Sequence, residues 1–217
     1  MYQKQQKNPL SNRGYPQEAT RNWVVFWYSG GMKYFYDTEF IEDGKTIDLI
    51  SIGIVSETGK EYYAISNEFK GKKASQWVKD NVLKYLPPQR PNPQFESPRL
   101  VEESRAWKSR EEIKKDIIAF IGEDKPEFWA YYADYDHVAL CQLFGTMMEL
   151  PKDWPMYTRD IKQLCDRLGD PSLPIQGEGE HHALADARWN KQAFDFLNTF
   201  GKGGVLPEKN PVLAALL

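Results

Sequence analysis

The stretch that most constrains the fold is KYFYDTEF at residues 33–40, an apolar and aromatic run that contains two carboxylates. The pattern predicts a buried strand, in which successive side chains point to opposite faces. Asp37 and Glu39 therefore project from the same face. Like charges this close repel unless one is protonated or a cation lies between them. A hard divalent metal ion is the simplest occupant, and a solvated strand end is the alternative that this stretch alone leaves open.

Composition and charge limit the class of protein. With 217 residues, 41% of them hydrophobic and 27% charged, the chain suits a single globular domain. No apolar run approaches the roughly 18 residues of a membrane span, so we expect no membrane partner. A net charge of −3 argues against indiscriminate nucleic-acid binding through a general positive field. We expect Cys141 and Cys165 to be reduced core thiols rather than a disulfide, as in a cytoplasmic protein.

The two ends of the chain differ in kind from its middle. Residues 1–31 are rich in Lys, Gln, Asn and Arg before a short aromatic patch, and they lack the order of a signal peptide. We expect an N-terminal extension at 1–31, a folded domain at 32–201 and a C-terminal tail at 202–217. Two interpretations of the extension stay open: a non-native leader, with Met32 as the natural start, or a disordered segment.

Hydrophobic periodicity predicts an α/β fold with a mixed sheet flanked by helices. Three antiparallel strands come first, and helices then alternate with strands. Ser109 and Glu112 match a capping box at the start of one helix. The proline-rich stretch 87–106 is interpreted as a long exposed loop. The expected strands are 33–40, 47–55, 60–66 and 127–133, and the expected helices are 74–85, 109–121, 135–147, 159–168 and 183–200.

Two of these helices begin with an acid at the head of an apolar stripe. Asp136 heads the stripe that packs on the sheet, so its carboxylate should point inward. Asp134 heads a weaker stripe and resembles an N-cap, and two capping acids remain the alternative. Asp186 heads the stripe of the last helix in the same way. Two helices thus each deliver an acid to the sheet.

A tandem histidine pair precedes the last of these acids. His181 and Asp186 are five residues apart, about 140° around a helix, so they cannot share a helical face. His181 should therefore lie on the glycine-rich approach, free to move beside the acids. His182 is four residues from Asp186 and would share its face, which makes it the rival. Either histidine suits proton transfer.

Taken together, the order Asp-x-Glu, Asp, His-x4-Asp resembles the DEDDh group of 3′–5′ exonucleases, which have the RNase H-like fold. The segments YDTEFIEDGKTIDLISIGIV, YDHVALCQL and HHALADAR are similar to the RNase AS-type bacterial exoribonucleases. The tyrosine-variant subgroup has tyrosine where His182 stands, so the histidine subgroup fits better. The resemblance implies that two Mg²⁺ or Mn²⁺ ions are held by Asp37, Glu39, Asp136 and Asp186, with His181 as general base.

The resemblance also implies a substrate, a product and an assembly. The substrate would be the 3′ end of a single-stranded RNA, with a leaning toward adenylate-rich ends, and the product a nucleoside 5′-monophosphate. The protein would be a homodimer. Two alternatives remain open: a DNA 3′–5′ exonuclease of the proofreading or repair type, and a non-catalytic nucleic-acid-binding module with the same fold.

Residues around the acids are candidates for substrate contacts, because single-stranded ends are recognised by stacking and phosphate contacts. Core packing is the alternative role for each. The candidates are Thr38, Phe40 as the stacking residue, Tyr135 and His137. Basic residues that could meet the trailing strand are Arg105, Lys108 and Arg110, although solvated surface is their commoner role.

Overall fold

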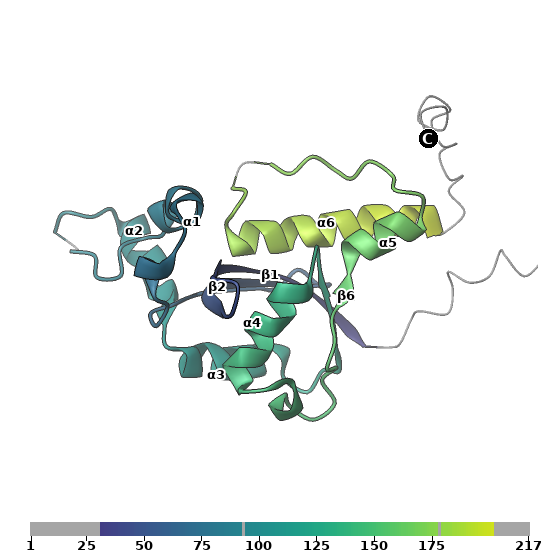
Figure 1. The fold of residues 1–217 in the computed structure, drawn as a ribbon, viewed down its shortest axis with the longest axis horizontal. Coiled ribbons are helices and arrows are strands. Elements are labelled where there is room, and N and C mark those ends of the chain that lie inside the picture. The colour runs from purple at the N-terminus through teal and green to yellow at the C-terminus, as the bar shows by residue number, and fades with distance from the viewer. Residues whose placement is uncertain (1–30, 93, 178, 202–217) are drawn as a thin grey trace, which may run out of the picture. The chain divides into compact units, whose positions relative to one another are not determined.

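The centre of the structure is a mixed β-sheet (Figure 1). The computed structural model describes residues 31–92, 94–177 and 179–201. The expected N-terminal extension and C-terminal tail lie outside the described residues, apart from Gly31. All described residues belong to one compact unit.

The described residues form a six-stranded sheet in the order β4-β3-β2-β1-β5-β6. The first three strands are antiparallel, whereas β4 runs parallel to β3, β5 to β1, and β6 to β5. The predicted mixed sheet is therefore confirmed. The strands are β1 (Met32–Glu42), β2 (Ile47–Ser56), β3 (Glu61–Ser66), β4 (Trp107–Lys108), β5 (Pro126–Ala130) and β6 (Arg159–Asp160).

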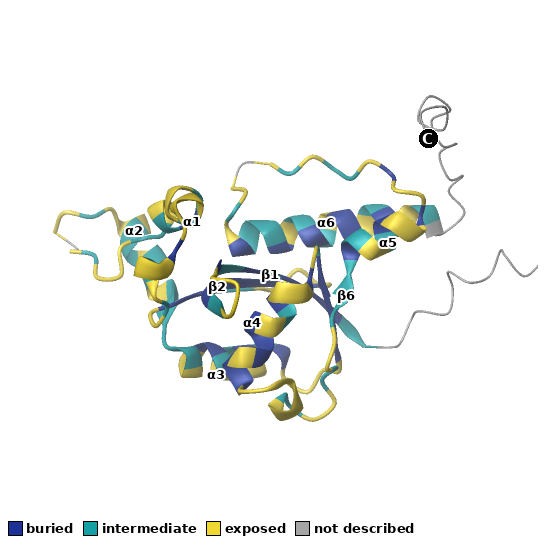
Figure 2. Ribbon diagram, in the orientation of Figure 1, coloured by how far each residue is buried: buried dark blue, intermediate teal, exposed yellow. Residues whose placement is uncertain are grey.

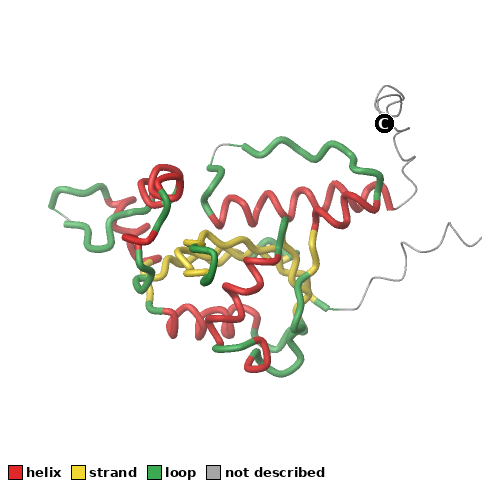
Figure 3. The backbone as a smooth tube through the Cα atoms, in the orientation of Figure 1, coloured by secondary structure: helices red, strands yellow, loops and turns green. Residues whose placement is uncertain are grey.

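Helices cover both faces of the sheet (Figure 3), and the strands between them are largely buried (Figure 2). On one face, α3 (Arg110–Ile121) and α4 (Asp134–Phe144) pack against alternate residues of β1 and β2. On the other face, α5 (Ile161–Arg167) and α6 (Ala183–Gly201) pack against β1 and β5.

The alternation of β1 separates the two cores. Tyr36 belongs to the core under α3 and α4, and Phe35 to the core under α5 and α6. Both side chains are almost fully buried. Asp37 follows Phe35 by two residues, so its carboxylate points to the α6 face. A β-bulge between Glu39 and Phe40 then shifts the register with β2.

Near the acid-bearing end of β1, the predicted helix 74–85 is two shorter elements. Residues Gln76–Asn81 form α1, and Leu83–Tyr85 form a 3₁₀ turn, η4. Val82 between them is buried with Ile41 and Ile50. The helix ends at Val82, whose φ is −118°, and the packing of Val82 in this core is a tertiary contact that periodicity does not contain.

The prediction of a long loop at 87–106 is wrong for its second half. Helix α2 (Pro98–Glu103) and a 3₁₀ turn at Ser104–Ala106 lie there. The Ser97 side chain accepts a hydrogen bond from the Leu100 amide, and Pro98 occupies the first turn. Ser followed by Pro is a helix-start signal that the density of prolines obscured.

Element ends account for the remaining differences. The strand predicted at 127–133 ends at Ala130, and the helix predicted from 135 to 147 ends at Phe144, before Gly145 at φ 111°. Strands β4 and β6 have two residues each, too few to show a periodic pattern.

Two other predictions are confirmed, one about helix capping and one about the cysteines. The capping box of Ser109 and Glu112 is present at α3. Cys141 and Cys165 are free and buried. No helix within the described ranges has both the length and the apolarity that crossing a bilayer requires.

Candidate active site

Three carboxylates meet on the α6 face of the sheet, at the bulged end of β1. Asp37 and Glu39 lie opposite Gly53 and Ser51 of β2. Asp186 comes from the first turns of α6. One ligand oxygen from each of the three acids lies within 4.8 Å of the others. Among the described residues this group has the spacing of a metal site.

The approach of α6 to the sheet depends on a glycine. A Cβ built on Gly53 would overlap main-chain atoms of Ala183 and Leu184 at the start of α6. A side chain on β2 would therefore push the helix outward. Farther along, the buried Asn190 amide donates to the Tyr36 carbonyl at 2.9 Å and fixes the helix against β1. These contacts bring Asp186 within reach of Asp37.

Replacing Gly53 by valine should separate Asp186 from the β1 acids. We expect a stability loss of about 1–3 kcal/mol from overpacking and a lower affinity for Mn²⁺. Thermal melting and calorimetric titration of Mn²⁺ measure the two effects. Gly177→Ala is the matched control, because a Cβ there meets nothing within 4 Å. Unchanged Mn²⁺ affinity in the Gly53 variant would contradict this role.

The fourth acid, Asp136, is held by the strand that carries the first two. Its Oδ1 accepts hydrogen bonds from the Thr38 amide at 2.8 Å and the Thr38 hydroxyl at 2.7 Å. Asp136 is 5% exposed. Asp136 lies outside the group of three acids with metal-site spacing. The Thr38 hydroxyl is thus engaged with Asp136 in this structure.

The neighbouring acid Asp134 is exposed on α4. The prediction that it caps the helix is wrong, because Ala133 is the N-cap residue and no side chain caps this end. The Ala133 amide instead donates to Asp160 Oδ2 at 2.8 Å. Ala133, which follows β5, and Asp160, the last residue of β6, thereby meet at the start of α4, a tertiary contact that local helix signals do not contain.

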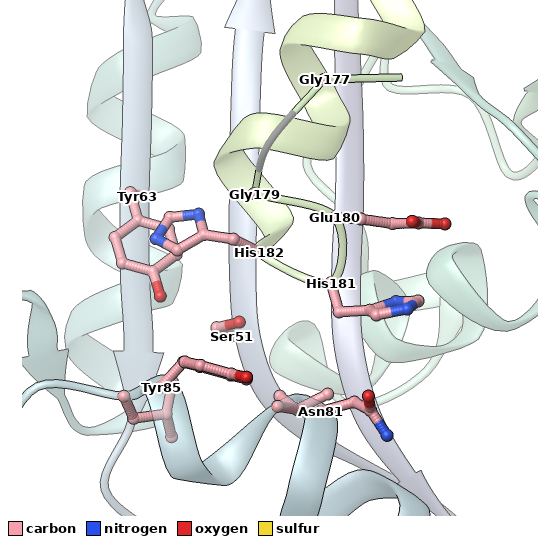
Figure 4. A pocket seen from close by; sticks show the side chains of 11 residues that line it. Ser51, Tyr63, Asn81, Tyr85, Gly177, Gly179, Glu180, His181 and His182 are labelled. Atoms are coloured by element: carbon pink, nitrogen blue, oxygen red, sulfur yellow. The ribbon is translucent and has the colours of Figure 1, made fainter. Parts of the chain in front are cut away.

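The two histidines point to opposite sides of the approach to α6 (Figure 4). The His181 ring packs edge-on against Trp77 of α1, with ring centroids 4.8 Å apart. The His182 ring stacks on Tyr63 of β3 at 4.5 Å. The backbone of His181 has φ 68°, so this residue is outside the helix. His182 keeps an exposed surface, yet desolvation lowers its pKa.

The approach segment also holds the Asp186 carboxylate. The His181 amide donates to Asp186 Oδ2 at 3.0 Å, and the Gln176 side chain donates to Asp186 Oδ1. Gln176 was not among the residues predicted from the sequence. No local pattern marks it, because its distance from Asp186 in space depends on the path of the whole segment.

Burial and mutual repulsion disfavour negative charge in this cluster. Asp37 is partly exposed, yet desolvation by the surrounding protein raises its pKa well above the usual range, and nearby acids add to the shift. Burial, with charge from Asp186 and Asp136, raises the pKa of Glu39 to about 8. Burial raises the pKa of Asp136 to about 6, against the Thr38 hydrogen bonds. Burial also raises the pKa of Asp186 to about 6. Bound cations would relieve this repulsion.

The metal-free protein should therefore lose stability as the pH rises. The folded-state pKa values of Glu39 and Asp186, about 8 and about 6, exceed the roughly 4 of unfolded carboxyls. Between about pH 4 and 8 the folded state binds more protons than the unfolded state, so the free energy of unfolding falls with pH. Melting in chelator should give a lower Tm at pH 8 than at pH 5. Added Mn²⁺ should reduce this difference, and equal Tm values in chelator would contradict the expectation.

The remaining predicted residues lie around the acids in different ways. Phe40 and Tyr135 form an edge-to-face pair with centroids 5.7 Å apart, and Tyr135 is half exposed. His137 turns toward Cys141, with its Nε2 3.6 Å from the sulfur. Each predicted basic residue is paired with an acid: Arg105 with Glu102, Lys108 with Asp116, and Arg110 with Asp48.

Comparison with solved structures defines the class of fold. The chain is similar to E. coli Exonuclease I in complex with a dT13 oligonucleotide, with a TM-score of 0.51 and 12% identity over 79% of this chain and 42% of that one. Apo Exonuclease I gives a TM-score of 0.52 at 12% identity, over 86% and 47% of the two chains. The chain spans less than half of these exonucleases, and the likeness establishes the RNase H-like fold alone.

The chain belongs to the Rv2179c-like family, whose domain is described as a 3′-5′ exoribonuclease Rv2179c-like domain and matches residues 32–197. One relative is the 3′-5′ exoribonuclease Rv2179c of Mycobacterium tuberculosis strain H37Rv. It is 44% identical over 176 residues, which are 80% of this chain and 97% of the relative. A second M. tuberculosis protein, the 3′-5′ exoribonuclease MT2234.1 of strain CDC 1551, has the same identity and coverage.

Proposed function

We propose that this protein is a divalent-cation-dependent 3′–5′ exoribonuclease that releases nucleoside 5′-monophosphates from single-stranded RNA. The observation that carries the proposal is the convergence of Asp37, Glu39 and Asp186 within 4.8 Å. Membership in a family of 3′-5′ exoribonucleases and 44% identity to a protein of that name support it.

The donor set fits hard divalent cations. Carboxylate oxygens are the ligands that Mg²⁺ and Mn²⁺ prefer. The raised pKa values of Glu39 and Asp186 show that these acids resist being ionised together without positive charge nearby. We propose Asp37, Glu39 and Asp186 as direct ligands and Asp136 as the fourth acid of a two-ion site. The ions would stabilise the attacking and leaving oxygens at phosphorus.

His181 is the proposed general base. Its amide is bound to Asp186 and its ring is on the β1 side of the approach segment (Figure 4). A neutral imidazole there can take the proton from the attacking water. Trp77 contacts this ring and limits its positions. His182, stacked on Tyr63 toward β3, is turned away from this role.

Phe40 and Tyr135 are the proposed stacking residues for the substrate. They form one aromatic pair, Phe40 follows Glu39 and Tyr135 precedes Asp136 in the sequence, and Tyr135 is half exposed. Thr38 acts through Asp136, to which its amide and its hydroxyl both donate. His137 is directed toward Cys141, so we propose a packing role for its ring.

The test is digestion of RNA and DNA oligomers of the same sequence, labelled at the 5′ end. We expect stepwise shortening of RNA in Mg²⁺ or Mn²⁺, release of 5′-monophosphates, and no reaction in chelator. Equal rates on DNA would favour the broader exonuclease, since only contacts to the 2′-hydroxyl separate the two polymers. RNA binding without hydrolysis would favour a non-catalytic module. Light scattering tests the homodimer that family resemblance implies.

A further inference from the structure

The segment between α5 and α6 runs back along α6 before it enters that helix (Figure 1). Residues 168–177 and 179–182 are the described part of this approach segment. Its path is anchored to α6, because the Trp189 indole N–H donates to the Pro174 carbonyl at 3.0 Å. Trp189 packs edge-on against Tyr131, with ring centroids 5.1 Å apart, at the border of the core under α5 and α6. Pro174 therefore has a defined place on α6.

The anchor at Pro174 brings Gln176 to the first turns of α6. Trp189 and Asp186 are three residues apart on the helix, so they lie on neighbouring turns of one face. Gln176 follows Pro174 by two residues, and its side-chain nitrogen donates to Asp186 Oδ1. The Gln176 amide thus contacts one of the three clustered acids.

Both oxygens of the Asp186 carboxylate are held by the approach segment. Gln176 donates to Oδ1, and the His181 amide donates to Oδ2 at 3.0 Å. Two such bonds fix the plane of the carboxylate, because rotation about the Cβ–Cγ bond would break both. An ionised carboxylate has about four lone-pair sites, so a site remains on each oxygen for a cation. The two hydrogen bonds are therefore compatible with cation binding by Asp186.

The two donors differ in what holds them in place. The His181 donor is a backbone N–H, which any residue except proline would supply. The Gln176 donor is a side-chain amide beside a hollow of about 210 Å³, which Gln192 of α6 also lines. Close packing does not impose the position of a side chain in such a place. The contact with Asp186 is then what directs the Gln176 amide.

We propose that Gln176 is a positioning residue for the cation site, whose amide holds Asp186 in the orientation that meets a cation shared with Asp37 and Glu39. Without this donor, the carboxylate would be held at one oxygen only. It would then have to be ordered when a cation binds, and ordering a side chain costs free energy. Gln176 acts through Asp186 and need not touch the cation or the RNA. The inference rests on the proposed cation-dependent function.

The test variant is Gln176→Met, which keeps an unbranched side chain of similar length and removes the donor. Calorimetric titration of Mn²⁺ into the full chain should give an affinity about 10- to 100-fold lower than in the unmodified protein, the usual loss when a hydrogen bond to a metal ligand is removed. Gln192→Met is the matched control, because Gln192 is exposed and lines the same hollow. Equal Mn²⁺ affinity in Gln176→Met and the unmodified protein would overturn the proposal.

A second variant, Gln176→Ala, checks that the effect comes from the missing donor. Alanine removes the donor together with the rest of the side chain, so the loss of Mn²⁺ affinity should match that of Gln176→Met. Normal affinity in Gln176→Ala would mean that methionine obstructs the site, and this result would also overturn the proposal. Circular dichroism checks that both variants keep the fold of the unmodified protein.

The dependence of RNA hydrolysis on Mn²⁺ concentration separates positioning from a general structural role. In Gln176→Met, the Mn²⁺ concentration that gives half the maximal rate should rise about 10- to 100-fold. The rate at saturating Mn²⁺ should approach that of the unmodified protein, because the acids and His181 are all retained. A lower maximal rate with an unchanged half-maximal concentration would contradict the positioning role.

Failure of the proposed function gives a different pattern. If Gln176→Met binds Mn²⁺ more weakly but neither form shortens RNA, the positioning role is retained and the nuclease proposal is lost. If both forms shorten RNA with the same Mn²⁺ dependence, the nuclease proposal is retained and the positioning role is lost. An unmodified protein that binds no Mn²⁺ would overturn both.

Discussion

Replacing Asp186 by asparagine should reduce RNA hydrolysis more than about 100-fold while raising the Tm of the metal-free protein at pH 8. Asp186 supplies one of the three ligand oxygens that lie within 4.8 Å. It also adds to the repulsion that raises the pKa of Glu39. Asparagine keeps the shape but removes the charge, so the cation site weakens and the empty fold gains stability.

Opposite changes in activity and stability identify a functional acid, because replacing an acid with a purely structural role would lower both the activity and the stability of the protein. Oligomer digestion, Mn²⁺ calorimetry and thermal melting in chelator measure the three quantities. Asp134→Asn is the matched control, since this exposed acid lies in the first turn of α4 outside the cluster. Full activity or unchanged Mn²⁺ affinity in Asp186→Asn would refute the ligand assignment.

Replacing His181 by alanine should lower kcat by about 10²- to 10⁴-fold, the usual contribution of a positioned general base. RNA affinity should change little, because the His181 contact to Asp186 is made by the backbone amide, which alanine retains. Single-turnover hydrolysis separates the chemical step from binding, and filter binding in Ca²⁺ gives the affinity.

The comparison variant is His182→Ala. Its ring stacks on Tyr63 and points away from β1, so the loss in kcat should be far smaller than for His181→Ala (Figure 4). A change in KM is the expected effect there, because His182 lines the pocket beside the approach to α6. A large loss of kcat in His182→Ala with near-normal kcat in His181→Ala would assign the proton acceptor to His182 instead.

The orientation of the acids could be predicted because burial patterns fix it. Alternation along β1 placed Asp37 and Glu39 on one face, and the apolar stripe of α4 distinguished the inward Asp136 from the exposed Asp134. The same argument aimed Asp186 at the sheet. Each of these inferences depends on which side of one element is buried, and sequence periodicity contains that information.

Contacts between elements could not be predicted in this way. The direction of the His181 ring depends on a backbone with positive φ and on Trp77 from another element. Gln176 reaches Asp186 only because of the path of the approach segment. Gly53 did carry a signal, since a lone glycine inside a strand often marks close backbone approach, but the signal does not say what approaches.

The order of the sheet has a consequence for biosynthesis. Asp37 and Glu39 are synthesised early, with β1, whereas Asp186 is synthesised late, with α6, the final described helix. The start of α6 packs on the backbone of β2 at Gly53. A nascent chain that has not yet produced α6 can pair its first strands but lacks Asp186, and with it one of the three clustered acids. A nuclease built in this order would not hydrolyse RNA near the ribosome until almost the whole domain has emerged and α6 has packed on the sheet.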